Sequence, residues 1–371
     1  MSAKWLRLAV GNLAVFALLL IFAELILQAI ALVRPSYEVL FLQPDRMLGW
    51  KHVPNHRWQW AGHYWYANEF SVTVQSNASG FRDVERAETK PAGVRRLALL
   101  GDSFIEAVQV PIAQTASQRL EALLNAKATE RWEVLNFGVS NYGVGQYSLA
   151  WTNEAKRYDP DVVAVLVARL HLERTVSKFE SGAFRQSSLR SLWVRPVFRL
   201  SADQLVHEPA ANFEDFKAMQ DEVIRTDFSG DRSRKRWQFI TLHYAKRLKA
   251  RVFAHQSDIG KRDTAYEDNL RAVGLRVIKE LGAQVTARGA RFVVIDVSRY
   301  FGDDADLASA LEHLSRMNGF DYVPAYQDLQ SASQRGIETR FRYDGHLTSE
   351  GNAILARAVF HVVEATMGAK P

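Results

Sequence analysis

A serine, an aspartate and a histidine of this chain have the residue types and the chain order of a catalytic triad. Ser103 is the last residue of the run LLGDS (99–103), and Asp344 and His346 lie in the run YDGHLTSEGN (343–352). A serine hydroxyl becomes a nucleophile when an imidazole takes its proton, and a carboxylate fixes the tautomer of that imidazole. Together the three side chains could transfer an acyl group through an acyl-serine intermediate.

The segments around these residues show strands alternating with helices. Apolar runs between helical stretches predict strands at LALL (97–100), EVLN (133–136), VVAVLV (162–167) and FVVID (292–296), with DYVPAY (321–326) as a weaker fifth. Strands that are separated by helices pair in parallel and are covered on both faces. We therefore expect an α/β fold with three α/β/α layers around a mostly parallel five-stranded sheet.

This fold would bring both motifs to one edge of the sheet. Ser103 would stand at the carboxyl end of the first strand, where ligands bind in open α/β sheets. Asp344 and His346 would lie on the loop that enters the last helix. Thr115 and Gln118 have the spacing of a capping box that opens the helix after the first strand. Two plainer readings stay open: Ser103 could only cap a helix, and the Asp-x-His run could be an ordinary surface loop.

The first 34 residues are typical of a membrane anchor. Residues 8–33 form an apolar run of 26 residues with few interruptions, which is long enough to cross a hydrocarbon core of about 30 Å. Lys4 and Arg7 precede it, and the positive-inside tendency then places the rest of the chain outside the cytoplasm. A cleaved signal peptide, with a small-x-small site at 29–31, stays open. A buried soluble helix is disfavoured because residues 13–23 leave it no polar face.

We expect three parts in the chain. These are the anchor at 1–34, an aromatic-rich lead-in at 35–94 that packs on the main domain, and the α/β domain at 95–371. Alternation in SVTV (71–74) predicts short strands in the lead-in. Residues 177–262 break the rhythm of the main domain without a clear strand, and we interpret them as an insertion or cap over the edge of the sheet.

Composition excludes several classes of protein. The chain has 371 residues, 47% of them apolar and 24% charged, and a net charge of +6, which is typical of a globular protein. The absence of cysteine excludes disulfide frameworks, thiolate metal sites and a cysteine nucleophile. We found no phosphate-binding glycine loop, dinucleotide fingerprint or metal-ligand cluster, so we expect no cofactor and no metal.

Residues 231–251 hold eight basic side chains and one acidic one. Nucleic acid is not expected as a partner, because the anchor places this stretch outside the cytoplasm. The stretch is interpreted as a solvated or headgroup-facing surface. Binding of an anionic polysaccharide is the alternative.

The two motifs together resemble those of the GDSL/SGNH hydrolase superfamily, in particular its membrane-anchored bacterial branch, which is found near polysaccharide-assembly functions. The similarity runs from about Asp45 to the C-terminus and includes NASGFRD (77–83) before the first strand. The resemblance implies Ser103 as nucleophile, with its N–H as an oxyanion donor, His346 as base and Asp344 as the residue that orients the base. No G-x-S-x-G motif is present, which separates the chain from the α/β-hydrolases.

Two family blocks are altered. The run NFGVSNYG (136–143) places Asn141 where the resemblance implies an oxyanion glycine; a backbone N–H suffices there, and asparagine tolerates the left-handed conformation. The third block ordinarily supplies an asparagine side chain to the oxyanion hole, but here the chain reads ARLHLER (168–174). Losing one such donor costs about 10²–10³ in rate. We expect His171 to replace it, with Arg169 as the alternative.

The sequence as a whole predicts a serine esterase that removes acyl, most plausibly O-acetyl, groups from a cell-surface or exported glycan. Its substrate would be an acylated glycan or a small ester. It would be a single-pass protein of the inner membrane with a periplasmic catalytic domain, and polysaccharide-assembly proteins are possible partners. A glycan O-acetyltransferase with the same triad stays open, because the two reactions differ only in whether water is excluded. A glycan-binding or assembly factor without catalysis also stays open.

Overall fold

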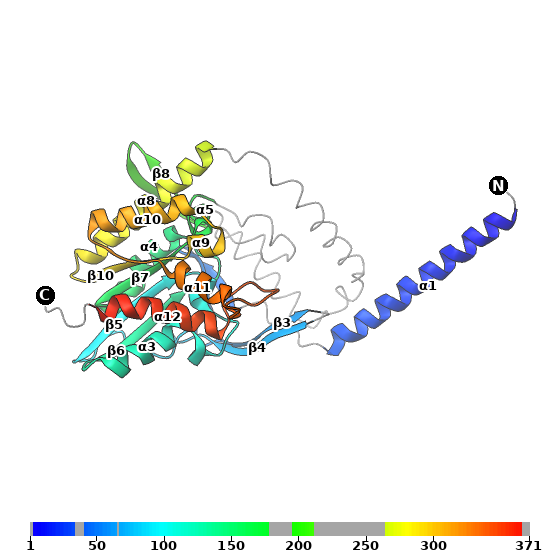
Figure 1. Cartoon of the computed structure of the whole chain (residues 1–371), viewed down its shortest axis with the longest axis horizontal. Coiled ribbons are helices and arrows are strands. Elements are labelled where there is room, and N and C mark those ends of the chain that lie inside the picture. The colour runs from blue at the N-terminus through cyan, green and yellow to red at the C-terminus, as the bar shows by residue number, and fades with distance from the viewer. Residues whose placement is uncertain (1–2, 34–40, 65–66, 178–194, 211–263, 366–371) are drawn as a thin grey trace. The chain divides into compact units, whose positions relative to one another are not determined.

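The structure is a computed structural model of the chain and describes residues 3–33, 41–64, 67–177, 195–210 and 264–365 (Figure 1). The chain divides into two compact units. One contains residues 1–36 and 222–264, and the other contains residues 37–221 and 265–371. The second unit holds all the described strands and the candidate site.

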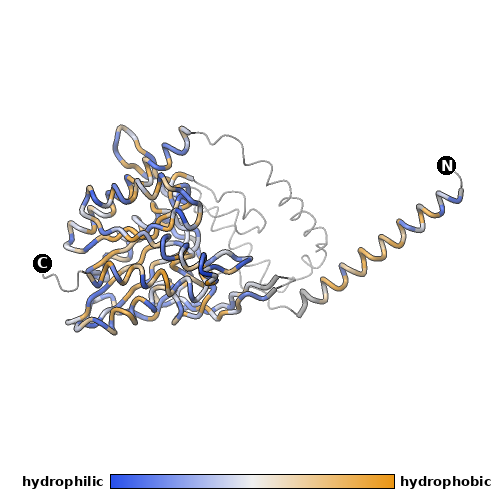
Figure 2. Tube along the Cα trace, in the orientation of Figure 1, coloured by the Kyte–Doolittle hydropathy of each residue, from blue (hydrophilic) through white to orange (hydrophobic). Residues whose placement is uncertain are grey.

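The first described element is the long helix α1 (Ala3–Val33). Its window Val10–Leu27 has a mean hydropathy of 2.4, and among the described helices it alone is long and apolar enough to cross a membrane. Figure 2 shows apolar colour along most of its length. The structure therefore contains the expected apolar N-terminal helix, and both a membrane anchor and a signal sequence have this character.

The central sheet has five parallel strands, as the sequence predicts. They are β5 (Val94–Gly101), β6 (Arg131–Gly138), β7 (Val162–Val167), β10 (Arg291–Asp296) and β11 (Asp321–Val323), arranged in the order β11-β10-β7-β5-β6. Strand β5, which leads to Ser103, is therefore an interior strand. The weakest predicted strand is also the shortest: β11 ends before Pro324, which has no N–H to donate to the sheet and instead precedes a helix.

Helices cover both faces of this sheet. One face carries α3 (Ala116–Lys127), α11 (Ala325–Gln334) and α12 (Ser349–Glu364), and the other carries α4 (Val144–Asn153), α8 (Thr264–Thr286) and α10 (Ala305–Asn318). Successive side chains of a strand point to opposite faces. Accordingly Leu97 and Leu99 pack with the first group of helices, and Ala98 and Leu100 with the second.

The short helical elements are α2 (Ser103–Glu106), η1 (Ile112–Gln114), η2 (Ala155–Tyr158), α5 (Arg169–Val176) and α9 (Ser298–Phe301). Two of them bear on the site: α2 directly follows β5, and α5 follows β7 with Ala168 as its N-cap.

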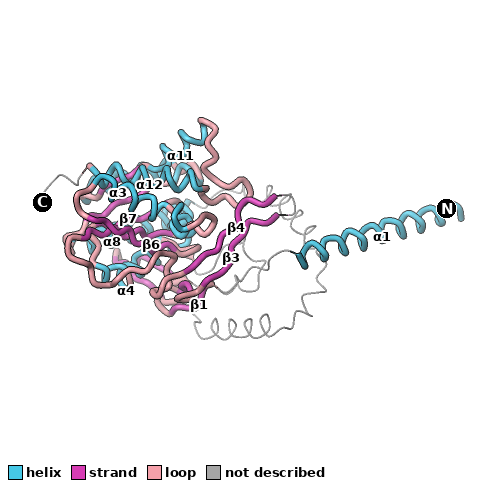
Figure 3. Tube along the Cα trace, turned by 90° about the horizontal axis from the view of Figure 1, so that it is seen from below, coloured by secondary structure: helices cyan, strands magenta, loops and turns pink. Residues whose placement is uncertain are grey.

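The lead-in forms two antiparallel hairpins. The first joins β1 (Leu42–Asp45) to β2 (Gly49–His52), and the second joins β3 (Arg57–Tyr64) to β4 (Ala67–Gln75). Figure 3 shows β3 and β4 side by side along their length. Val72 and Val74 are buried while their neighbours are exposed, so the predicted alternation lies in β4. Trp50 and Trp58 join the core of the α/β domain, and the lead-in is thus packed on that domain.

The stretch 177–262 contains a hairpin that the sequence analysis missed. Strands β8 (Val197–Ser201) and β9 (Gln204–Glu208) pair antiparallel through a two-residue turn. Ala202 and Asp203 in this turn have φ of 46° and 62°, as a type I′ turn requires. Neither residue is a glycine, so the usual turn signal was missing. The basic stretch 231–251 lies outside the described residues.

Candidate active site

Ser103 lies at the carboxyl end of β5, where the chain turns sharply from the strand into α2. Asp102 caps α2, and its Oδ1 accepts a hydrogen bond from the Phe104 N–H at 3.1 Å. Helix α2 then folds back over the strand end. A Cβ on Gly101 would lie 2.2 Å from Cγ1 of Ile105, so the glycine of the motif is required for this close approach. Ser103 itself is 8% exposed.

Ser103, His346 and Asp344 lie within hydrogen-bonding distance of one another. The Ser103 Oγ is 2.8 Å from Nε2 of His346, and Nδ1 of His346 is 2.5 Å from Oδ1 of Asp344. Ser103 and His346 are 243 positions apart in the sequence. The carboxylate can hold the Nδ1 proton, which leaves Nε2 free to accept the serine proton.

The loop that carries Asp344 is fixed by a residue that the sequence analysis missed. The carboxylate of Glu69, on β4, accepts the N–H groups of Tyr343 and Asp344 at 2.9 Å each. Within the loop, the Phe341 N–H donates to the His346 carbonyl at 2.9 Å. The hairpin of the lead-in is therefore part of the support of the site. No local pattern could reveal this contact, because Glu69 and Asp344 are 275 positions apart.

The loop after β6 brings Asn141 beside the nucleophile's own loop. Asn141 has φ of 65°, the left-handed conformation that the sequence analysis allowed for it. The Trp50 indole N–H donates to the Ser140 carbonyl at 3.0 Å, and the buried Arg195 donates to the Asn141 carbonyl at 3.3 Å. Trp50 and Arg195 thus fix the backbone carbonyls of this loop. They hold it with Asn141 in the left-handed conformation.

His171, the expected replacement donor, lies beside Asp102. The His171 ring is fully buried; its Nδ1 accepts the Ala168 N–H at 3.0 Å, and its Nε2 lies 3.1 Å from Oδ2 of Asp102. Since Nδ1 accepts a hydrogen bond, the ring proton is on Nε2, on the side that faces Asp102. Nε2 makes no hydrogen bond among the described residues, so the expectation that His171 donates to an oxyanion stays a prediction.

Arg169, the alternative, is also engaged elsewhere. Its Nε donates to Glu267 at 3.1 Å, and its Nη1 donates to Glu173 at 3.1 Å. It lies on the side of α5 that faces α8. The charge that does reach the site belongs to Arg174, one turn beyond His171, whose Nη1 lies 2.7 Å from Oδ2 of Asp102.

Asp102 is ionised in spite of its burial. Burial alone would raise the pKa of its carboxyl, but contacts with His171 and Arg174 and the hydrogen bond from the Phe104 N–H hold that pKa well below its usual range. A fully buried negative charge therefore stands directly before the nucleophile in the chain.

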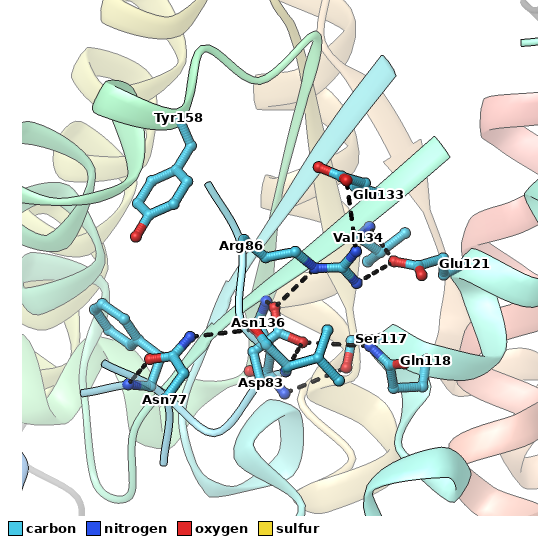
Figure 4. A network of polar contacts seen from close by, with 12 residues as sticks. Asn77, Asp83, Arg86, Ser117, Gln118, Glu121, Glu133, Val134, Asn136 and Tyr158 are labelled. Atoms are coloured by element: carbon cyan, nitrogen blue, oxygen red, sulfur yellow. Dashed lines mark hydrogen bonds and ion pairs between the residues drawn. The ribbon is translucent and has the colours of Figure 1, made fainter. Parts of the chain in front are cut away.

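A polar network around Asp83 and Asn136 (Figure 4) contacts α2. The Asn136 side chain, on β6, donates to the Ile105 carbonyl at 2.8 Å, and its backbone N–H donates to Asp83 at 3.1 Å. Asp83 also accepts from the Gln118 side chain at 3.3 Å, so the Gln118 side chain does not complete the predicted capping box, although Thr115 does cap α3. Burial raises the pKa of Asp83 to about 7, an effect that Arg86 opposes.

The end of α2 is tied down by two further buried side chains. Arg82 donates to the carbonyl oxygens of Glu106 and Val110 at 2.7 and 2.5 Å. Burial lowers the pKa of Arg82 to about 10, although nearby Glu106 raises it. His52 lies 2.5 Å from the Glu106 carboxylate, and both are fully buried. The run 77–83 thus braces the helix that bears the nucleophile.

Among the described residues, no group of three His, Asp or Glu side chains is arranged to hold a metal ion. The side chains gathered around Ser103 are instead those of nucleophilic acyl transfer: a nucleophile, a base in contact with it and a carboxylate in contact with the base.

No family model matches the chain, and no curated protein matches it. Solved structures do resemble it. TesA matches with 10% sequence identity and a TM-score of 0.42, over 73% of this chain and 99% of TesA. A GDSL-like lipase from Parabacteroides merdae matches with 11% identity and a TM-score of 0.39, over 73% of this chain and 95% of that one. A catalytic mutant of Axe2, an acetylxylan esterase from Geobacillus stearothermophilus, matches with 11% identity and a TM-score of 0.38, over 76% and 98%.

Proposed function

We propose that this chain is a membrane-anchored serine esterase of the GDSL/SGNH type. The observation that carries the proposal is the continuous contact from Ser103 Oγ through His346 to Asp344, at 2.8 and 2.5 Å. A helix cap or a surface loop does not need these contacts. Their order and distances match those of a nucleophile, a general base and the residue that orients the base.

In the proposed reaction, Nε2 of His346 takes the proton of Ser103 while Oγ attacks the ester carbonyl carbon. The tetrahedral intermediate collapses when the imidazolium gives that proton to the departing alkoxide, which leaves the acyl group on Ser103. Water then attacks the acyl-serine with His346 again as base, and the carboxylic acid leaves. The Asp344 carboxylate stabilises the imidazolium in both halves of the reaction.

The negative oxygen of the intermediate would be bound by backbone N–H groups. The Ser103 N–H stands in the first turn of α2 and the Asn141 N–H on the neighbouring loop, and neither donates to another group among the described residues. Donors that are fixed before the reaction stabilise the oxyanion without reorganisation.

The proposed substrate is an O-acetyl ester on a cell-surface or exported glycan. This choice is supported by the resemblance of the motifs to the membrane-anchored bacterial branch and by the apolar α1 helix behind Lys4 and Arg7, which would hold the site on the outer side of the inner membrane. An acceptor sugar in place of water would make the same machinery an O-acetyltransferase.

The deciding experiment measures release of p-nitrophenol from p-nitrophenyl acetate by the full chain in detergent micelles. We expect turnover by the parent, and a loss of about 10⁴-fold or more in Ser103→Ala. Ser177→Ala, a change of the same kind outside the site, serves as the control. Equal rates for the parent and Ser103→Ala would exclude the esterase. Faster consumption of the ester when acceptor oligosaccharide is added, with acetylated sugar as product, would indicate the transferase.

A further inference from the structure

Arg174 joins the two loops that carry the proposed oxyanion donors. Its Nη1 donates to Oδ2 of Asp102 at 2.7 Å and to the Tyr142 carbonyl at 3.3 Å, and its Nη2 donates to Oδ1 of Asn141 at 3.1 Å. Asp102 precedes Ser103 after β5, and Asn141 follows β6. A planar guanidinium can bond two acceptors in a fixed geometry, which the single ammonium of a lysine cannot.

Arg174 also neutralises a charge that would oppose catalysis. The Asp102 carboxylate is fully buried and ionised. Asp102 directly precedes Ser103, whose N–H would bind the oxyanion. Two negative charges at close range in a region of low dielectric repel each other strongly. Nη1 of Arg174 lies 2.7 Å from Oδ2 of Asp102, so the charge of the guanidinium offsets the charge of this carboxylate.

Asn141 needs support because a residue other than glycine is held there in the left-handed conformation. Such a conformation persists only where the surroundings fix it. Arg174 holds its side-chain oxygen and Arg195 its carbonyl oxygen, so the direction of the Asn141 N–H is set from two sides.

We propose that Arg174 is the positioning residue of the oxyanion hole. It compensates for the asparagine that is missing from the third block of this chain. It acts through Asn141 and Asp102 and does not touch the substrate. This inference rests on the proposed esterase function. Arg174 lies on the same helix as His171 and Arg169, but its proposed role is to position the donors and not to donate to the oxyanion.

The test compares Arg174→Ala and Arg174→Lys with the parent, in the full chain and with p-nitrophenyl acetate as substrate. Because the oxyanion is bound only in the transition state, we expect kcat to fall on the order of 10²-fold in Arg174→Ala, with KM changed much less. Millimolar guanidinium should restore part of this loss in Arg174→Ala and none in Ser103→Ala. Arg276→Ala is the control: it removes an arginine of α8 that pairs with Glu280, outside the site, and should keep the parent's kcat.

Arg174→Ala removes the guanidinium that pairs with the buried Asp102 carboxylate, and this loss alone could make the variant fold poorly. The comparison is then made between Asp102→Asn and the double variant Asp102→Asn/Arg174→Ala, in which that charge is gone; a further loss of about 10-fold in kcat and rescue by guanidinium are expected. An unchanged kcat in Arg174→Ala, or a loss that guanidinium does not restore at an unchanged melting temperature, overturns the positioning role alone. A parent without turnover that depends on Ser103 overturns the esterase and this role together.

Discussion

The imidazole of His346 stands between two oxygens, and each contact has a separate task. In the proposed reaction the contact with Ser103 transfers the proton, and the contact with Asp344 decides which ring nitrogen carries it. The aspartate loop adds a third contact, because the His346 N–H also lies 3.3 Å from Oδ1 of Asp344. One carboxylate thus orients both the ring and the backbone of the base.

Asp344→Asn should therefore lower kcat by about 10⁴-fold and leave KM nearly unchanged, because an amide can hold the ring in the wrong tautomer. Hydrolysis of p-nitrophenyl acetate under steady-state conditions measures both constants. Asp303→Asn is the control, since the Asp303 carboxylate is 76% exposed and pairs only with Arg299 among the described residues. A kcat for Asp344→Asn within 10-fold of the parent would contradict the orienting role.

Asp83 should make stability depend on pH. Its pKa is raised by burial to about 7 in the folded protein, against an ordinary value of 3.8. Between these values the unfolded chain has lost the proton and the folded protein has kept it. The free energy of unfolding then falls by up to about 1.4 kcal/mol per pH unit as the pH rises through this window, and it levels off above it.

Urea unfolding at pH 5 and pH 8 tests this. The parent should lose about 2–3 kcal/mol more than Asp83→Asn between the two pH values, because the variant has no carboxyl to titrate. The same pH dependence in both proteins would show that Asp83 is ionised in the folded state at pH 5.

The sequence predicted the residues that motifs carry and missed those that only the fold brings together. Ser103, Asp344 and His346 follow from motifs, and the distances among them agree with the roles predicted. Glu69 could not be found, because a single glutamate on a strand gives no local signal. Arg174 did give one: it lies three positions after His171, on the same helical face. The motif does not indicate its role, because a positioning residue does not touch the oxyanion.

At the scale of elements, α2 and β6 approach so closely that a glycine is required between them. A Cβ on Gly138 would lie 2.4 Å from the Glu106 nitrogen and 2.8 Å from the Ile105 carbonyl carbon, both of them backbone atoms. Backbone atoms of a helix that is fixed at both ends cannot move aside alone. The position of Ser103 therefore depends on a residue of the neighbouring strand.

Gly138→Ala should destabilise the protein by about 1–3 kcal/mol and also lower kcat, because α2 must shift. Gly302→Ala is the matched control, since its Cβ would meet only the Ser298 carbonyl oxygen at 3.8 Å. Thermal unfolding and hydrolysis rates are measured for both. A Gly138→Ala variant with the parent's stability and rate would show that α2 can be displaced without consequence.

The hairpin of β3 and β4 should contribute to the rate through Glu69. Glu69→Gln loses one of two acceptors for the N–H groups of the Asp344 loop, which corresponds to about 1–1.5 kcal/mol and hence roughly 10-fold in kcat; Glu69→Ala should lose more. Gln59→Ala, on the solvent-exposed side of the same hairpin, is the control. Equal rates in all three variants and the parent would mean that the loop keeps its shape without Glu69.

Prediction of the elements depended on how regular each pattern is. β5, β6, β7 and β10 were found because a strand buried on both faces is a continuous apolar run. β8 and β9 were missed because they are short and joined by Ala202 and Asp203, which are not the usual residues of a type I′ turn. The contribution of the lead-in to the site depends on the contacts of Glu69 with the loop of Tyr343 and Asp344, and no pattern within the lead-in shows them.

At the scale of the whole molecule, the proposed location follows from α1. A fusion of alkaline phosphatase to the C-terminus should be active in cells, and the matched β-galactosidase fusion inactive, because the proposed orientation places Lys4 and Arg7 in the cytoplasm. The reverse pair of activities would place the site in the cytoplasm. Extraction at high pH then separates an anchored chain, which stays with the membrane, from a chain released after cleavage of the helix.

The 243 positions between Ser103 and His346 have a consequence during biosynthesis. A ribosome makes the serine early and the histidine near the end, so an emerging chain carries a hydroxyl of ordinary reactivity for most of its synthesis. His346 lies just before α12, which packs against α3. If the proposed function holds, a chain that ends before this part lacks its base, and acyl transfer needs the chain to be made at least as far as His346.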